Sequence, residues 1–227
     1  MKTKLQYYYP NDIPGLIRAV KQKDEDLEDN FLEIKTITDT HSTLFTTYHL
    51  DGDYDWDDLR FPASGINPAG APSPPNVDTV NGGTLLFPDT GAHIIGFVAQ
   101  LPHTWREGTT LHPHCHWQKT TSASGNVMWR FSYKWAPINA VMDAAFTVSS
   151  ATTTVAGTPD TNTADKHLIT AFTSISATGK KISDMLVCTL ERVGSDGTDT
   201  YGANARLLEI DIHYQVDSFG SDAEFVK

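Results

Sequence analysis

The clearest pattern of hydrophobic and polar positions lies in two stretches near the middle of the chain, Leu111–Gln118 and Asn126–Trp135. In the second stretch every other side chain from Val127 to Trp135 is apolar. In the first stretch three histidines alternate with other residues: His112, His114 and His116 with Pro113, Cys115 and Trp117. A period of two predicts β-strands, so the three imidazoles share one strand face. The Ser-, Thr- and Gly-rich segment between the stretches predicts that they form a hairpin.

Similar patterns continue from Gly82 to the C-terminus and predict eight strands, separated by turn signals. The predicted strands are Thr84–Phe87, His93–Leu101, Leu111–Gln118, Asn126–Trp135, Ala145–Val155, Lys166–Ile175, Met185–Val193 and Arg206–Val216. Many short strands with hardly any helix pattern predict an all-β fold, and eight strands in two sheets is the number that a jelly roll needs. We therefore expect an eight-stranded jelly-roll-like β-sandwich preceded by an extended N-terminal arm.

The chain before Gly82 has a different pattern, which divides the protein into three parts. Residues 1–60 carry a weak helix stripe and loosely alternating segments without a core of their own, which predicts an N-terminal arm with a short helix or strands. Residues 61–81 are rich in proline, which lacks an amide donor and cannot join the middle of a sheet. This proline-rich composition predicts a semi-rigid linker over residues 61–81. Residues 82–227 form the predicted β-sandwich domain.

Charge and composition exclude several classes of function. The formal net charge of −11 argues against nucleic acid as a partner, because nucleic-acid binding needs a basic surface. No apolar run reaches the roughly 20 residues that cross a bilayer, so we expect no membrane contact. The N-terminus lacks the apolar core of a signal peptide, which favours synthesis in the cytosol. Cys115 and Cys188 fall in apolar strand patterns, which favours buried free thiols over a disulfide.

His112, His114 and His116 are candidate metal ligands, because two imidazoles two residues apart on a strand can bind one ion. Cupin-type enzymes use such a pair within a jelly roll, and His103 or His213 would supply a third ligand here. A cupin also has a glutamate shortly after its paired histidines, whereas the four residues after His116 contain no acid. A cupin-like metal enzyme that uses the three histidines is therefore a secondary alternative to ordinary interface or surface histidines.

Two other features offer weaker candidate chemistry. Asp51–Asp58 is the densest acidic cluster and resembles part of a calcium loop, although its glycine is misplaced and the closing glutamate is missing. A solvated acidic loop or a docking patch is the favoured interpretation. Trp105 lies beside a predicted turn and is the candidate for an exposed aromatic side chain that stacks on sugars.

Enzymatic catalysis has little support in the sequence. It contains no Gly-x-Ser-x-Gly elbow and no Gly-rich phosphate loop between a strand and a helix. We therefore expect a protein that is not an enzyme, with no catalytic residue and no cofactor.

The last predicted strand indicates self-association. Its apolar face is Leu208, Ile210, Ile212, Tyr214 and Val216, and its polar face is Leu207, Glu209, Asp211, His213 and Gln215. This polar face and the strand face that carries His112, His114 and His116 need partners when buried, because an unpaired buried polar group costs about 1–3 kcal/mol. A symmetric interface provides such partners, so we expect a homo-oligomer, most simply a trimer.

Four segments resemble a group of phage and prophage proteins: Leu111–Trp117 (LHPHCHW), Val127–Pro137 (VMWRFSYKWAP), Gly194–Gly202 (GSDGTDTYG) and Leu207–Lys227 (LLEIDIHYQVDSFGSDAEFVK). The resemblance covers roughly residues 55–227. It implies a virion component, either a head decoration (cement) protein or a part of a tail or head fibre. It also implies a trimeric β-sandwich whose N-terminal arm grips neighbouring subunits, and it brings no catalytic residues.

The resemblance and the pattern together predict a non-enzymatic structural protein of a phage particle. We expect a capsid decoration protein that is made in the host cytoplasm, resides in the virion and binds the major capsid protein or other virion proteins. The alternative is a carbohydrate-binding adhesin domain on a tail or head fibre.

Overall fold

The structure is a computed structural model that describes residues 54–68, 73–154, 163–225 and 227. These residues belong to a compact unit that runs from Tyr54 to Lys227. Nearly all of the predicted N-terminal arm, residues 1–53, lies outside the described residues. Within the described part of the chain, no helix has the length and apolarity needed to cross a membrane.

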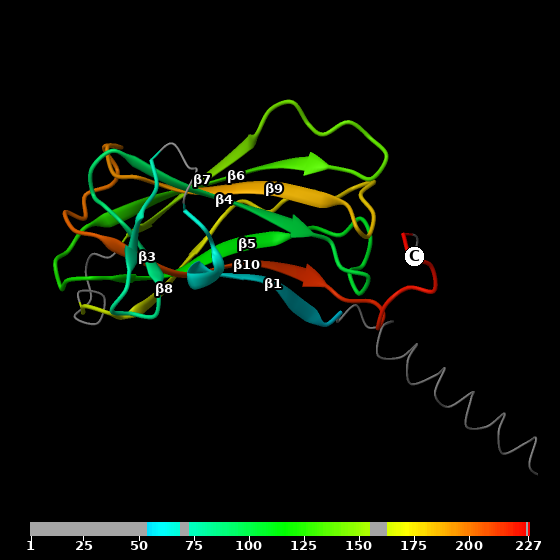
Figure 1. The fold of residues 1–227 in the computed structure, drawn as a ribbon, viewed down its shortest axis with the longest axis horizontal. Helices are drawn as coiled ribbons and strands as arrows, with labels where there is room; N and C mark the ends of the chain where they lie inside the picture. Colours follow the sequence, from blue (N-terminus) through cyan, green and yellow to red (C-terminus); the bar gives the residue numbers. More distant parts are fainter. Residues whose placement is uncertain (1–53, 69–72, 155–162, 226) are drawn as a thin grey trace, which may run out of the picture. The chain divides into compact units, whose positions relative to one another are not determined.

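The described residues form ten strands in two antiparallel sheets that pack face to face (Figure 1). Sheet A contains β1 (Trp56–Pro62), β2 (Asn76–Asp78), β3 (Thr84–Phe87), β5 (His112–Lys119), β8 (His167–Ala171) and β10 (Ala205–Gln215). Sheet B contains β4 (Ala92–Gln100), β6 (Asn126–Ala136), β7 (Thr147–Thr154) and β9 (Met185–Val193). One short 3-10 turn, η1 (Ala63–Gly65), follows β1. All eight predicted strands are present. Seven differ from the prediction by no more than two residues at either end, whereas the strand predicted over Lys166–Ile175 is the shorter β8.

The strand pairing is that of a jelly roll. β3 pairs with β10, β4 with β9, β5 with β8 and β6 with β7, so the two halves of the chain run alongside each other as one long rolled hairpin. The order is β3-β10-β5-β8 in sheet A and β4-β9-β6-β7 in sheet B. This arrangement confirms the predicted jelly-roll sandwich.

The predicted hairpin between β5 and β6 is wrong. β5 lies in sheet A and β6 lies in sheet B, so the segment between them crosses from one sheet to the other. Sequence neighbours usually pair, but in a jelly roll the long-range partners β8 and β10 occupy both edges of β5.

Two strands come from segments that the sequence pattern assigned to the arm and the linker. β3 pairs with the first part of β10, and β1 pairs with the remainder of the same edge of β10. β2 is the edge strand beyond β3. Both positions suit their sequences, because Pro62 stands at the last position of β1 and a proline-rich neighbourhood is tolerated at a sheet edge.

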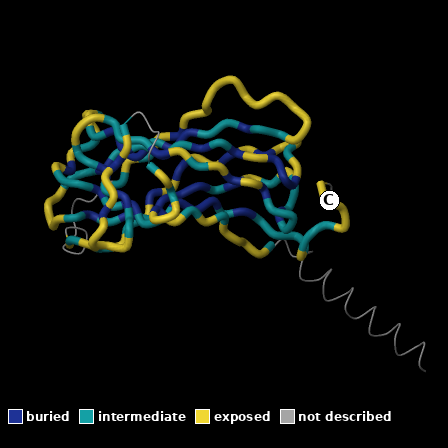
Figure 2. Tube along the Cα trace, in the orientation of Figure 1, coloured by how far each residue is buried: buried dark blue, intermediate teal, exposed yellow. Residues whose placement is uncertain are grey.

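Buried positions are concentrated along the strands of the two sheets (Figure 2). The core that they form is built from aromatic and aliphatic side chains. Trp117 from β5 and Trp129 from β6 contact each other across the sandwich with ring centroids 6.0 Å apart. Cys115 and Cys188 are buried free thiols, as predicted, and burial raises the pKa of each thiol. The alternation that places Cys115 and Trp117 in the core therefore places the histidines of β5 on the outer face of sheet A.

Candidate functional site

The two polar faces that the sequence presents separately form one surface on the outside of sheet A. β5 and β10 are neighbours, and their register sets Asp211 opposite His114, Glu209 opposite His116 and His213 opposite His112. We call this surface the histidine face; it comprises His112, His114, His116, Asp211 and His213. Apart from the Oδ1 atom of Asp211, which has no hydrogen-bond partner among the described residues, these polar groups have partners within one chain.

Three side chains of the histidine face converge on one point. The Nε2 atoms of His114 and His116 are 2.9 Å apart. The Oδ2 atom of Asp211 is 3.0 Å from His116 Nε2 and 3.6 Å from His114 Nε2. Among the described residues, these three form the group whose geometry could hold a metal ion. We call them the His114–His116–Asp211 triad.

The other histidines proposed as ligands have different partners. The His112 Nδ1 atom lies 2.9 Å from the Ser174 hydroxyl, and its ring packs edge-on against Trp56. The His213 Nε2 atom lies 2.9 Å from the Asp58 Oδ1 atom.

His103 contacts serine side chains, Ser221 and Ser183. Of the predicted candidates His112, His114 and His116, the structure brings His114 and His116 together, and Asp211 is the third member of the triad.

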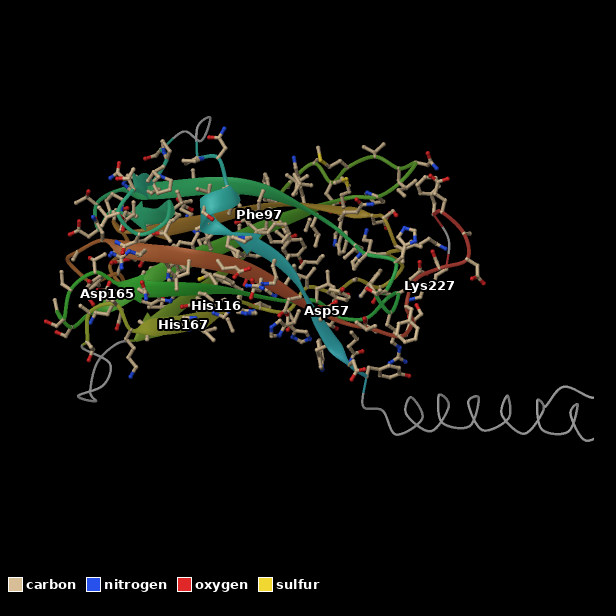
Figure 3. All side chains as sticks on the ribbon, turned by 60° about the horizontal axis from the view of Figure 1, so that its bottom comes forward. Asp57, Phe97, His116, Asp165, His167 and Lys227 are labelled. Atoms are coloured by element: carbon tan, nitrogen blue, oxygen red, sulfur yellow. The ribbon has the colours of Figure 1, made fainter. Side chains whose placement is uncertain are left out.

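A further histidine from a third strand supports the triad. His167, on β8, places its Nε2 atom 2.6 Å from His116 Nδ1, and Figure 3 shows the two residues on neighbouring strands. The strand pattern around His167 gave no hint of this contact, because β8 joins β5 only through long-range pairing.

An open hollow of about 320 Å³ lies beside the triad, lined by Asp58, Arg60, His116, His167, Leu208, Glu209 and Asp211. At this hollow the Arg60 guanidinium donates two hydrogen bonds to the Glu209 carboxylate, of 2.8 and 2.7 Å. A small molecule or water can therefore reach the triad from solvent. The core fills the space between the sheets, so the site lies outside the sandwich, unlike a site within a jelly roll of the cupin kind.

Burial shifts the pKa of two members of the triad, His114 and Asp211. It lowers the pKa of His114, and the nearby His213 and His116 lower it further. An imidazole with a lowered pKa is neutral at neutral pH and has a free lone pair. Burial also raises the pKa of the Asp211 carboxyl, and the charge of Glu209 adds to this effect.

The acidic cluster does not form a continuous loop in the described part of the chain. Asp57 and Asp58 belong to β1, where Asp57 accepts a hydrogen bond of 2.8 Å from the Tyr214 hydroxyl. Asp58 pairs with His213. The first half of the cluster, Asp51–Asp53, lies outside the described residues, so the calcium alternative stays a prediction.

The prediction of an exposed Trp105 is wrong. Its side chain has no exposed surface and belongs to the core cluster. Its backbone forms an isolated β-bridge with Val216, next to the end of β10. The half-exposed tryptophan of the described chain is Trp56, which is 51% exposed beside His112.

A second surface of interest lies at one end of sheet B. The segment from Ile138 to Val148 is exposed throughout and is visible in Figure 2 as the long loop that leads into β7. Its large apolar side chains are Ile138, Val141, Met142, Phe146 and Val148, and Met185 of β9 is also exposed, beside Ala136 at the end of β6. We call Ile138–Val148 together with Met185 the apolar surface.

No family model matches the chain, and no curated protein matches it. Among solved structures, the chain is similar to isomalto-dextranase from Arthrobacter globiformis T6 in complex with panose (14% identity, 68% of this chain and 23% of that chain, TM-score 0.37). It is also similar to the CBM22-2 xylan-binding domain of Xyn10C from Paenibacillus barcinonensis (9% identity, 69% of this chain and 99% of that chain, TM-score 0.34). The chain thus spans less than a quarter of the isomalto-dextranase. TM-scores this low assign no function to the protein.

Proposed function

We propose that this protein is a non-enzymatic structural component of a phage particle, a decoration protein that binds the major capsid protein through the apolar surface. The observation that carries the proposal is the continuous exposure of Ile138–Val148, where Val141 is 92% exposed. A contiguous exposed apolar patch on a soluble domain marks an interaction site. The resemblance of four segments to phage proteins supports the choice of partner.

The strand next to this segment fits the same role. β7, with the sequence TVSSATTT, carries no charged side chain and pairs only with β6 among the described strands. Natural edge strands are normally protected by charges, prolines or coverage, because an unprotected edge pairs with other chains. A partner that covers β7 and the apolar surface provides this protection.

The test compares two substitutions with the same chemistry at equally exposed sites. Val141→Asp places a charge in the apolar surface, and the control Val80→Asp places one at a residue that is 88% exposed in the turn after β2. We expect the wild-type and Val80→Asp proteins to copurify with phage particles in stoichiometric amounts, measured by quantitative mass spectrometry. We expect Val141→Asp to reduce that occupancy at least tenfold.

Absence of the wild-type protein from purified particles would overturn the proposal, as would equal occupancy of the two variants. A reconstruction of the particle shows whether the protein lies on the head or on a fibre. Density on a fibre, together with a glycan ligand on an array, would instead support the carbohydrate-binding adhesin alternative.

A further inference from the structure

We propose that His114, His116 and Asp211 bind one divalent transition-metal ion, such as Zn²⁺, on the outer face of sheet A. This inference does not depend on the proposed role in the virion. Its basis is the geometry of three ligand atoms from two adjacent strands, whose register is set by the β5–β10 ladder.

The distances between the ligand atoms match those around a bound ion. Zinc binds histidine nitrogen and carboxylate oxygen at about 2.0–2.2 Å, so two ligand atoms lie about 3.0 Å apart at a right angle and about 3.4 Å apart at a tetrahedral angle. The three observed separations are 2.9, 3.0 and 3.6 Å. A single position therefore lies at bonding distance from all three atoms, without movement of the backbone.

The Asp211 carboxylate, whose Oδ2 atom is the proposed ligand, is incompletely satisfied at its other oxygen among the residues described. Its side chain is only 8% exposed. Within the described part of the chain its Oδ1 atom is buried without a hydrogen-bond partner. A buried, incompletely satisfied carboxylate costs free energy, and a cation bound at this position would offset that cost.

The surroundings of the triad are those of a metal site. A histidine ligand usually donates its other ring N–H to a neighbour that fixes the ring orientation. His167 Nε2 lies 2.6 Å from His116 Nδ1 and can accept that proton. The contact with His167 thus holds the His116 ring in place before an ion arrives.

The type of ligand selects the class of ion. Two imidazoles and one carboxylate suit Zn²⁺, Fe²⁺, Co²⁺ or Ni²⁺, whereas Ca²⁺ and Mg²⁺ prefer oxygen ligands. Three protein ligands beside an open hollow leave at least one coordination position for water or for an outside ligand.

The experiment uses the tag-free full chain, stripped of metal by chelator and dialysed. Co²⁺ is added while its visible absorption is recorded, because its d–d bands report the coordination geometry. Zn²⁺ binding is then measured by calorimetry. We expect one equivalent of either ion to bind, and His116→Gln to weaken Zn²⁺ binding at least ~100-fold. His112→Gln, a change of the same kind on the same strand face but outside the triad, should alter it less than ~3-fold.

Two results would overturn the inference. One is the absence of stoichiometric uptake by the wild-type protein. The other is equal binding by His116→Gln and His112→Gln, which would mean that the ion binds loosely to any surface histidine. Circular dichroism without metal establishes that each variant is folded. If His116→Gln fails this control, Asp211→Asn takes its place and is expected to lose binding as well.

Discussion

Asp78 illustrates how a single side chain holds a turn and a sheet together. Its carboxylate accepts hydrogen bonds from the backbone amides of Val80 and Asn81, at 3.1 and 3.2 Å, and from the Asn81 side chain, at 2.8 Å. It also accepts a hydrogen bond of 2.9 Å from Arg206 of β10. The Asn81 hydrogen bonds, together with Arg206, lower the pKa of the Asp78 carboxyl. Asp78 therefore fastens the β2–β3 turn to β10.

This lowered pKa gives a pH-dependent prediction. A carboxyl whose pKa is lower in the folded state stabilises the fold above its unfolded pKa of about 3.9 and loses that contribution as the pH falls through the folded value. We expect Asp78→Asn to be less stable than wild type at pH 7, with the difference shrinking below about pH 4. Urea unfolding at a series of pH values measures it. A difference that stays constant down to pH 2.5 would contradict the assigned role.

Single residues also mark where the sequence pattern was misleading. Leu208 was predicted to share the apolar face with Ile210, but Leu207 is the fully buried residue and Leu208 lines the hollow beside the triad. The pairing register of β10 against β5 shifts between Leu207 and Glu209. Such a bulge reverses the faces on one side of it, and bulges are frequent next to functional sites.

At the scale of elements, the link between β9 and β10 is organised by a buried arginine. Arg192 ends the inward-facing series of β9 and is fully buried. Its guanidinium binds both carboxylate oxygens of Asp199, at 2.9 and 2.8 Å. It also donates to the backbone oxygens of Phe87, Tyr201 and Ala203. One side chain thus joins β9, the end of β3 and the loop before β10.

We expect Arg192→Met to destabilise the fold by about 3–5 kcal/mol, because it leaves the buried Asp199 carboxylate without its countercharge. Arg130→Met is the matched control, since Arg130 pairs with Glu191 at 3.0 Å and is partly exposed. Surface ion pairs contribute about 0–1 kcal/mol, so the control should lose no more than that. Chemical denaturation of both variants measures the losses. Equal losses would show that Arg192 has no special structural role.

At the scale of the whole molecule, the homotrimer stays a prediction. The structural feature that favours it is now the free edge of β7 among the described strands and not the polar strand faces. Most polar groups of the histidine face have partners within one chain, whereas β7 presents an uncharged edge. A closed symmetric assembly covers such edges. We expect light scattering at micromolar concentration to give about three times the chain mass of 25.0 kDa. A mass equal to one chain would refute the trimer and leave the metal site unaffected.

The sequence by itself determined the class of fold, eight of the ten described strands and most of their faces. Period-two alternation is a property of the extended backbone, so it located eight strands, put the three histidines of β5 on one face and placed both cysteines in the core. β1 and β2 were missed because both are largely exposed edge strands, whose sequences carry little alternation of apolar and polar residues.

Only the tertiary structure decided which strands became neighbours. Asp211 and His167 are distant from His116 in sequence, and they reach it because the rolled hairpin sets β10 on one side of β5 and β8 on the other. The same pairing left His112 with Ser174 and Trp56. Local propensity says which way a side chain faces. The choice of partner strand depends on how the whole core packs, which no local pattern contains.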